Sequence, residues 1–206
     1  MKTFAILLLL GYSVAIYGQE IQPEFDGHTW EAPYSLPTPE GWAIERFSIP
    51  ISFAPQILYT GIEDIRFSPG WSKATSDEYW TYGFLWYLEG EVNVDSEILN
   101  SNLKAYYTGL IAANGSKIPV EKIIPVATSF REARKDTGDI KTYFGTITMT
   151  DYMQQKPIVL NCKVHVKSCL GEKRTFIFYE LSPKPLSHPV WLSLDKLWSE
   201  FTCRKT

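Results

Sequence analysis

The stretch EYWTYGFLWYLE, residues 78–89, decides the fold. Successive side chains of a strand point to opposite faces, and here both alternating sets are apolar. One set consists of Trp80, Tyr82, Phe84, Trp86 and Leu88, and the other of Tyr79, Leu85 and Tyr87. A strand that is apolar on both faces has to be covered on both faces. The stretch therefore predicts a central strand in a layered structure.

The sequence on either side supplies the other elements of that structure. Alternating apolar residues predict two strands before the stretch, over 43–53 and 61–67, and Pro50 marks the first as an edge strand or a bulge. After the stretch, Asp95 or Ser96 caps a helix that ends at Asn114-Gly115. Four more strands are expected over about 123–131, 141–151, 157–167 and 174–181, and then a final helix whose apolar stripe is Leu194, Leu197, Trp198 and Phe201.

This order of elements predicts the fold class. Strands that follow one another in blocks with short connections pair in the antiparallel sense. We therefore expect an α+β fold with a mainly antiparallel sheet of about six to seven strands. The order is βββα-ββββα, and two helices cover the sheet in a layered sandwich.

The first 18 residues have the layout of a secretory signal peptide. One charged residue, Lys2, precedes the unbroken apolar run 4–10, and the small residue Gly18 ends the segment. The segment is shorter than the roughly 20 apolar residues that a membrane span needs. We expect cleavage before Gln19 and an exported mature protein without a membrane span, located in the periplasm or outside the cell.

The remainder divides into an arm and one domain. Residues 19–41 contain four prolines, which exclude a regular helix or a central strand, so this segment is expected to be an extended arm. Residues 42–206 are expected to form a single α+β domain. That length is sufficient for a hydrophobic core.

Three cysteines, Cys162, Cys169 and Cys203, lie in the last quarter of the chain. An oxidising compartment favours one disulfide and one free thiol. Cys162 alternates with apolar residues in its strand and should be buried. We therefore predict a Cys169–Cys203 disulfide that closes a loop of about 35 residues. A helix packed on the inner face of the sheet could instead bring Cys203 to Cys162.

Composition and motifs exclude several classes of function. The net charge of −3 comes without a basic patch, so nucleic acid is not expected as a partner. The sequence has no P-loop, dinucleotide-binding fingerprint, HExxH motif or EF-hand loop, and we expect no cofactor. The spacing of the cysteines does not match a zinc site, and no metal site is predicted.

The sequence does not identify catalytic residues, and enzymatic activity is not the favoured interpretation. Three histidines are present, but no nucleophile motif accompanies them. His165 is expected on a solvated strand face and His188 in a loop. The alternative is a small secreted hydrolase that uses two carboxylates across a cleft. Its candidates are Glu63, Asp64, Asp77 and Glu78, in combinations such as Asp64 with Asp77 or Glu78.

Aromatic residues make up 15% of the chain, with seven Trp and twelve Tyr, and they either fill a large core or line a binding groove. Exposed Trp and Tyr rings stack on sugars and on apolar ligands. Trp71 lies in a Pro-Gly loop between two predicted strands, and loops are where binding residues concentrate. We predict that Trp71 and Tyr59 form an exposed patch beside Glu63 and Asp64. The alternative is that Trp71 folds back onto the core.

The favoured function is therefore a non-catalytic module that binds a small molecule, a glycan or a protein. The hydrolase is the second hypothesis. A structural accessory protein of the cell envelope is the third. A cleft with converging carboxylates would favour the hydrolase, and an open aromatic groove would favour the binding module.

Overall fold

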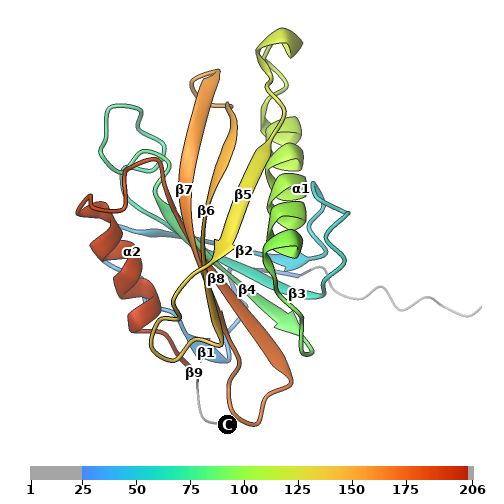
Figure 1. Ribbon diagram of the computed structural model, residues 1–206, viewed down its shortest axis with the longest axis vertical. Helices are drawn as coiled ribbons and strands as arrows, with labels where there is room; N and C mark the ends of the chain where they lie inside the picture. Colours follow the sequence, from blue (N-terminus) through green and yellow to red (C-terminus); the bar gives the residue numbers. More distant parts are fainter. Residues whose placement is uncertain (1–24, 204–206) are drawn as a thin grey trace, which may run out of the picture.

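The computed structural model describes residues 25–203 of the chain. The predicted signal peptide, residues 1–18, and the cleavage position before Gln19 lie outside the described residues. Within them, two helices and a seven-stranded sheet form an α+β fold (Figure 1). This confirms the predicted fold class.

The large sheet is antiparallel throughout. Its strands lie in the order β2-β3-β4-β8-β7-β6-β5, so β4 and β8 lie near the middle. The strands are β2 (Ala43–Ile49), β3 (Gly61–Phe67), β4 (Tyr82–Glu89), β5 (Ala127–Glu132), β6 (Lys141–Asp151), β7 (Lys156–Lys167) and β8 (Arg174–Ser182). The stretch that decides the fold thus supplies a strand with neighbours on both sides, as predicted.

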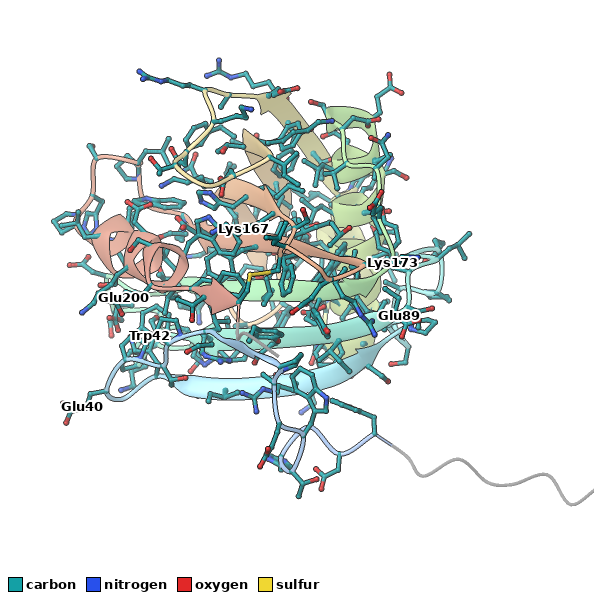
Figure 2. All side chains as sticks on the ribbon, turned by 90° about the horizontal axis from the view of Figure 1, so that it is seen from below. Glu40, Trp42, Glu89, Lys167, Lys173 and Glu200 are labelled. Carbon is teal, nitrogen blue, oxygen red and sulfur yellow. A yellow bond between two sulfur atoms is a disulfide. The ribbon has the colours of Figure 1, made fainter. Side chains whose placement is uncertain are left out.

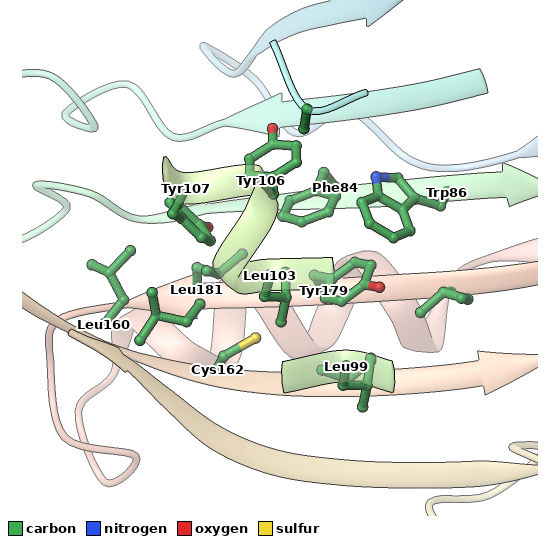
Figure 3. Packing of buried hydrophobic residues seen from close by; sticks show 14 of the residues in the cluster. Phe84, Trp86, Leu99, Leu103, Tyr106, Tyr107, Leu160, Cys162, Tyr179 and Leu181 are labelled. Carbon is green, nitrogen blue, oxygen red and sulfur yellow. The ribbon is translucent and has the colours of Figure 1, made fainter. Parts of the chain in front are cut away.

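Helix α1 (Ser96–Asn114) covers one face of the sheet. Asp95 is its N-cap, and the Asp95 side chain accepts a hydrogen bond from the backbone amide of Ile98 at 2.8 Å. Its buried side chains pack against the β4–β8 region, where the ring of Phe84 stacks on Tyr179 and Tyr106 (Figure 3). This face holds the larger of the two hydrophobic clusters.

Helix α2 (Val190–Ser199) covers the opposite face (Figure 1). It packs on the other alternating set of β4 and β8 side chains, among them Leu85 and Phe178. The ring of Trp198 stacks on Phe178 with their centroids 5.3 Å apart. Apolar residues on both faces of the central strand therefore correspond to two covering layers.

Residues 30–36 of the N-terminal arm lie on the same face as α2. The arm's strand β1 (Tyr34–Ser35) pairs with β9 (Thr202–Cys203) at the end of the chain. The Cys169–Cys203 disulfide lies beside this pair, with the two Cα atoms 6.0 Å apart (Figure 2). The predicted pairing of cysteines is confirmed, and Cys162 is buried and free, as expected.

Three predicted strand boundaries differ from the structure by more than one residue. Strand β2 ends at Ile49, before Pro50, and β5 begins at Ala127, after the short helix η1 (Val120–Lys122). Strand β4 begins only at Tyr82 because residues 76–81 form turns, with hydrogen bonds from Tyr79 N to Ser76 O and from Thr81 N to Glu78 O. Local turn hydrogen bonds override the alternation of apolar residues there.

The predicted exposure of His165 is wrong. It lies on the strand face that was expected to be polar and solvated, but its side chain is only 2% exposed. Helix α2 and the 136–139 loop cover this part of β7, and charged partners surround the imidazole there.

Candidate functional site

An aromatic pocket lies between helix α1 and the β2–β3–β4 part of the sheet. Its cavity is about 250 Å³. Eight aromatic side chains line it: Phe47, Phe53, Phe67, Trp71, Trp80, Tyr82, Tyr106 and Tyr152. They come from two loops, three strands, α1 and the turn after β6, so residues distant in sequence meet here. We call this site the aromatic pocket.

The loop between β3 and β4 holds Trp71 in the wall of the aromatic pocket. The backbone amide of Trp71 donates to Ser68 O at 3.1 Å, and the Trp80 amide donates to Trp71 O at 2.8 Å. The Glu78 carboxylate accepts a hydrogen bond from the Gly70 amide at 2.7 Å. Trp71 is half-buried, and its ring lies 4.4 Å from that of Phe67, centroid to centroid. The Pro-Gly loop thus positions one face of an aromatic ring.

Trp80 has an unusual backbone conformation. Its φ of 56° lies in the left-handed region, which is unfavourable for a bulky residue. Such conformations cluster at functional sites, because the surrounding structure has to impose them. Among the described residues, the buried Trp80 Nε1 has no hydrogen-bond partner. The indole N–H is buried inside the wall, so it is not a group that the cavity exposes to a ligand.

Glu63 is buried behind the pocket wall. The hydroxyl of Tyr106, which lines the pocket, donates to Glu63 Oε1 at 2.7 Å, and Trp86 Nε1 donates to Oε2 at 2.8 Å. Burial raises the pKa of Glu63 to about 8; the two hydrogen bonds oppose this, and the nearby charge of Glu45 adds to it. At neutral pH the carboxyl group is therefore mostly protonated.

The mouth of the aromatic pocket is polar and acidic. Glu45 and Asn114 are its exposed lining residues. Glu45 is the one charged side chain among the lining residues, which include no Lys, Arg or His.

The structure separates the four residues of the predicted patch. Trp71 lines the pocket, and Glu63 lies behind its wall. Tyr59 is not a lining residue; its hydroxyl accepts a hydrogen bond from Asn102 Nδ2 at 3.1 Å. Asp64 points to the opposite face of the sheet, because neighbouring residues of a strand alternate. Glu63 and Asp64 are both fully buried, so neither contributes an exposed acid beside Trp71.

Several lining residues were not predicted as site residues, notably Phe53, Trp80 and Tyr152. Trp80 was assigned to a strand interior, and Phe53 to the end of another strand. Trp71 was identified because it is an aromatic residue in a predicted loop. The same criterion would also have identified Tyr152, which lies between β6 and β7.

The four candidate carboxylates of the hydrolase hypothesis have different partners. Glu63 binds Tyr106 and Trp86, and Glu78 binds the Gly70 amide. Asp77 is exposed and pairs with Lys184 at 2.6 Å. Asp64 is buried on the other face, where its Oδ1 accepts from Arg46 Nε at 2.8 Å and it also pairs with Arg66.

A polar pocket beside the arm is lined by Arg46 and Arg66. Arg66 donates to Asp64 and to three backbone carbonyl oxygens, those of Leu36, Pro37 and Ile65. These acceptors satisfy the guanidinium, so it fastens the arm to the sheet.

A buried charge network beneath α2 was not predicted from the sequence. His165 Nδ1 lies 2.7 Å from Asp139 Oδ2, and His165 Nε2 lies 3.3 Å from Glu180 Oε1. Lys163 lies 3.5 Å from Glu180 and pairs with Asp195 of α2. Burial lowers the pKa of His165, but the contacts with Asp139 and Glu180 outweigh it and raise the pKa to about 9.

The same network contains the residues that could hold a metal ion. One potential ligand atom from each of Asp136, Asp139 and His165 lies within 4.8 Å of the others. Asp139 already accepts hydrogen bonds from Trp198 at 2.9 Å and from Thr142 at 2.8 Å. Asp139 and His165 Nδ1 therefore already have protein partners, whereas among the described residues His165 Nε2 and both Glu180 carboxylate oxygens are buried without a hydrogen-bond partner. Together these groups form an ion-pair network between α2, the 136–139 loop, β7 and β8.

Comparisons of the chain with protein-family models, with curated proteins and with solved structures find no match.

Proposed function

We propose that the protein is a non-catalytic binding module that takes a small, largely apolar ligand into the aromatic pocket. The observation that carries this proposal is a cavity of about 250 Å³ walled by eight aromatic side chains. Ligand sites are concave and mostly apolar, with a few polar groups that orient the ligand. The Glu45 carboxylate at the mouth is such a group.

The size of the cavity limits the ligand. Sites for drug-sized molecules have volumes of roughly 300–1,000 Å³, so this pocket suits a compact group of about one or two rings. Larger ligands would place only one end in it. A glycan or a protein side chain could supply that end.

The chemistry of the pocket favours binding over catalysis. Its lining residues include no His, Cys, Ser or Lys, and nucleophilic catalysis needs a nucleophile beside a base. The hydrolase hypothesis finds no comparable support, because its four carboxylates bind different partners. A structural accessory role in the cell envelope is the third hypothesis, and it would be supported if the pocket bound no ligand.

We also propose an exported location, in the periplasm or outside the cell. The Cys169–Cys203 disulfide supports it, since disulfides persist in oxidising compartments. The apolar N-terminal segment, read as a signal peptide, supports it independently.

Neither helix of the described residues is long and apolar enough to cross a membrane.

The test is a titration of the purified protein with indole, a neutral two-ring probe, followed by calorimetry. We expect binding with a dissociation constant of about 1 mM or tighter, equivalent to about 4 kcal/mol. Trp71→Ala removes one face of the pocket and should weaken binding at least fivefold. Trp42→Ala is the matched control, because Trp42 is also partly buried but packs in the cluster on the opposite face. Equal affinities for both variants, or no binding by the wild type, would contradict the proposal.

A further inference from the structure

We propose that the ligand of the aromatic pocket is a small organic cation that carries a quaternary or alkylated ammonium group. This inference rests on the proposed binding function and specifies its ligand class.

The rings surround the cavity from several directions. Phe67 and Trp71 lie on one side with their centroids 4.4 Å apart, and Trp80 and Tyr152 form an edge-on pair at 5.2 Å. Phe53 approaches Tyr106 of α1 edge-on at 5.1 Å. The face of an aromatic ring carries negative potential, so a cation within about 6 Å of a centroid is attracted to it. A small cavity lined by several aromatic rings is the kind of site that recognises ammonium groups.

The charges around the pocket have the sign that attracts a cation. Glu45 is at the mouth, and no basic side chain is among the lining residues. The field of Glu45 reaches the wall: burial raises the pKa of Tyr152 to about 12, and the charges of Asp151 and Glu45 contribute to the rise. An anionic ligand would meet repulsion here without a positive partner.

Hydrogen bonding in the wall also disfavours a strongly polar neutral ligand. The hydroxyl groups of Tyr82 and Tyr106 are engaged with Tyr107 and Glu63. The Asn114 amide donates to Leu110 O at 2.9 Å. A methylated ammonium group needs no hydrogen bonds, and it gains from both the aromatic faces and the acidic mouth.

The experiment compares two ligands of the same shape. Choline carries the ammonium charge, and neohexyl alcohol replaces its nitrogen by carbon, so that volume is kept and charge is lost. Calorimetric titration of the full mature chain at low ionic strength should show choline binding about tenfold more tightly than neohexyl alcohol. Phosphocholine, the headgroup form of the same cation, should bind more weakly than free choline because its phosphate meets Glu45.

A charge-neutralising variant tests the role of the mouth. Glu45→Gln should weaken choline binding about threefold and leave neohexyl alcohol unchanged. Glu40→Gln is the control, because Glu40 is exposed and does not line the pocket. It should bind both compounds like the wild type.

The outcomes separate this inference from the proposed function. Equal affinities for choline and neohexyl alcohol, or tighter binding of the alcohol, would overturn the cation preference and leave the binding function intact. Binding of indole alone would have the same meaning. Failure of choline, neohexyl alcohol and indole alike to bind a natively folded protein would overturn both proposals.

Discussion

At the scale of single residues, Glu63 is the group whose surroundings most alter its chemistry. It is fully buried between α1 and the sheet and receives hydrogen bonds from Tyr106 and Trp86. Because burial outweighs these bonds, the pKa of Glu63 is about 8, compared with 4.5 for a free Glu. The folded protein therefore holds a proton at neutral pH that the unfolded chain releases.

This difference predicts how stability depends on pH. Between pH 4.5 and about 8, Glu63 binds a proton more often in the folded state than in the unfolded state. The contribution of this proton to stability is therefore complete below pH 4.5 and is lost as the pH rises to about 8. Glu63→Gln is isosteric with the neutral acid and removes this dependence. From pH 5 to pH 8, the wild type should lose about 3–4 kcal/mol more than the variant, at about 1.4 kcal/mol per pKa unit.

Urea unfolding at both pH values measures this difference. Comparison with the variant cancels the contributions of other titrating groups, including His165 and Glu180, whose pKa values are also raised. Glu40→Gln, at an exposed position, should retain the wild-type dependence. Parallel pH profiles for the wild type and Glu63→Gln would show that Glu63 is ionised in the folded protein.

Residue environments were predictable where strand alternation alone determines them. Alternation places Cys162 inward and leaves Cys169 and Cys203 at element ends that are able to meet. It failed for His165, because a buried ion-pair network occupies a face that alternation marks as polar. For Trp80, alternation predicted the correct core cluster but not the backbone, which is left-handed because Trp80 lies in the turn that precedes β4.

At the scale of elements, the arm is attached by a buried ion pair. Asp64 of β3 is fully buried and pairs with Arg46 and Arg66, and the Tyr34 hydroxyl donates to it at 3.1 Å. Arg66 in turn donates to the arm carbonyl oxygen of Leu36 at 3.2 Å. One carboxylate therefore joins β2, β3 and the arm.

Asp64→Asn should be strongly destabilising. It removes the negative charge between two guanidinium groups, and breaking a buried pair typically costs about 3–5 kcal/mol. The arm, residues 25–40, should also become sensitive to limited proteolysis. The control is Glu89→Gln, which breaks the exposed pair with Arg174 and should cost less than about 1 kcal/mol. Similar small losses in urea unfolding for both variants would show that the ion pair does not hold the arm.

Most elements could be predicted, and their ends less well. The alternation of apolar residues gave β3 and β6 with their observed bounds, because these strands begin and end where the pattern does. Strand β4 begins later than predicted, because the residues before Tyr82 form turns whose hydrogen bonds are accepted by Ser76 O and Glu78 O. The two-residue pair of β1 and β9 could not be foreseen, because it forms only when the arm and the end of the chain meet on the sheet.

At the scale of the whole molecule, the layers create the aromatic pocket. Helix α1 packs across one face of the sheet. There, aromatic side chains of β2, β3 and β4, together with Trp71 and Trp80 of the loop between β3 and β4, line one cavity with Tyr106 of α1. The sequence predicted Trp71 as a binding residue from its loop alone. It could not predict the cavity, because that depends on the juxtaposition of segments from residue 45 to residue 152.

The most direct test of the aromatic pocket as a ligand site is the ¹H–¹⁵N spectrum of the seven tryptophan indole groups during titration with indole. Single Trp→Phe variants assign the signals. We predict that the signals of Trp71 and Trp80 shift and that those of Trp42 and Trp191, in the cluster on the opposite face, stay in place. Unchanged signals for Trp71 and Trp80 at saturating indole, or larger shifts for Trp42 or Trp191, would contradict the account.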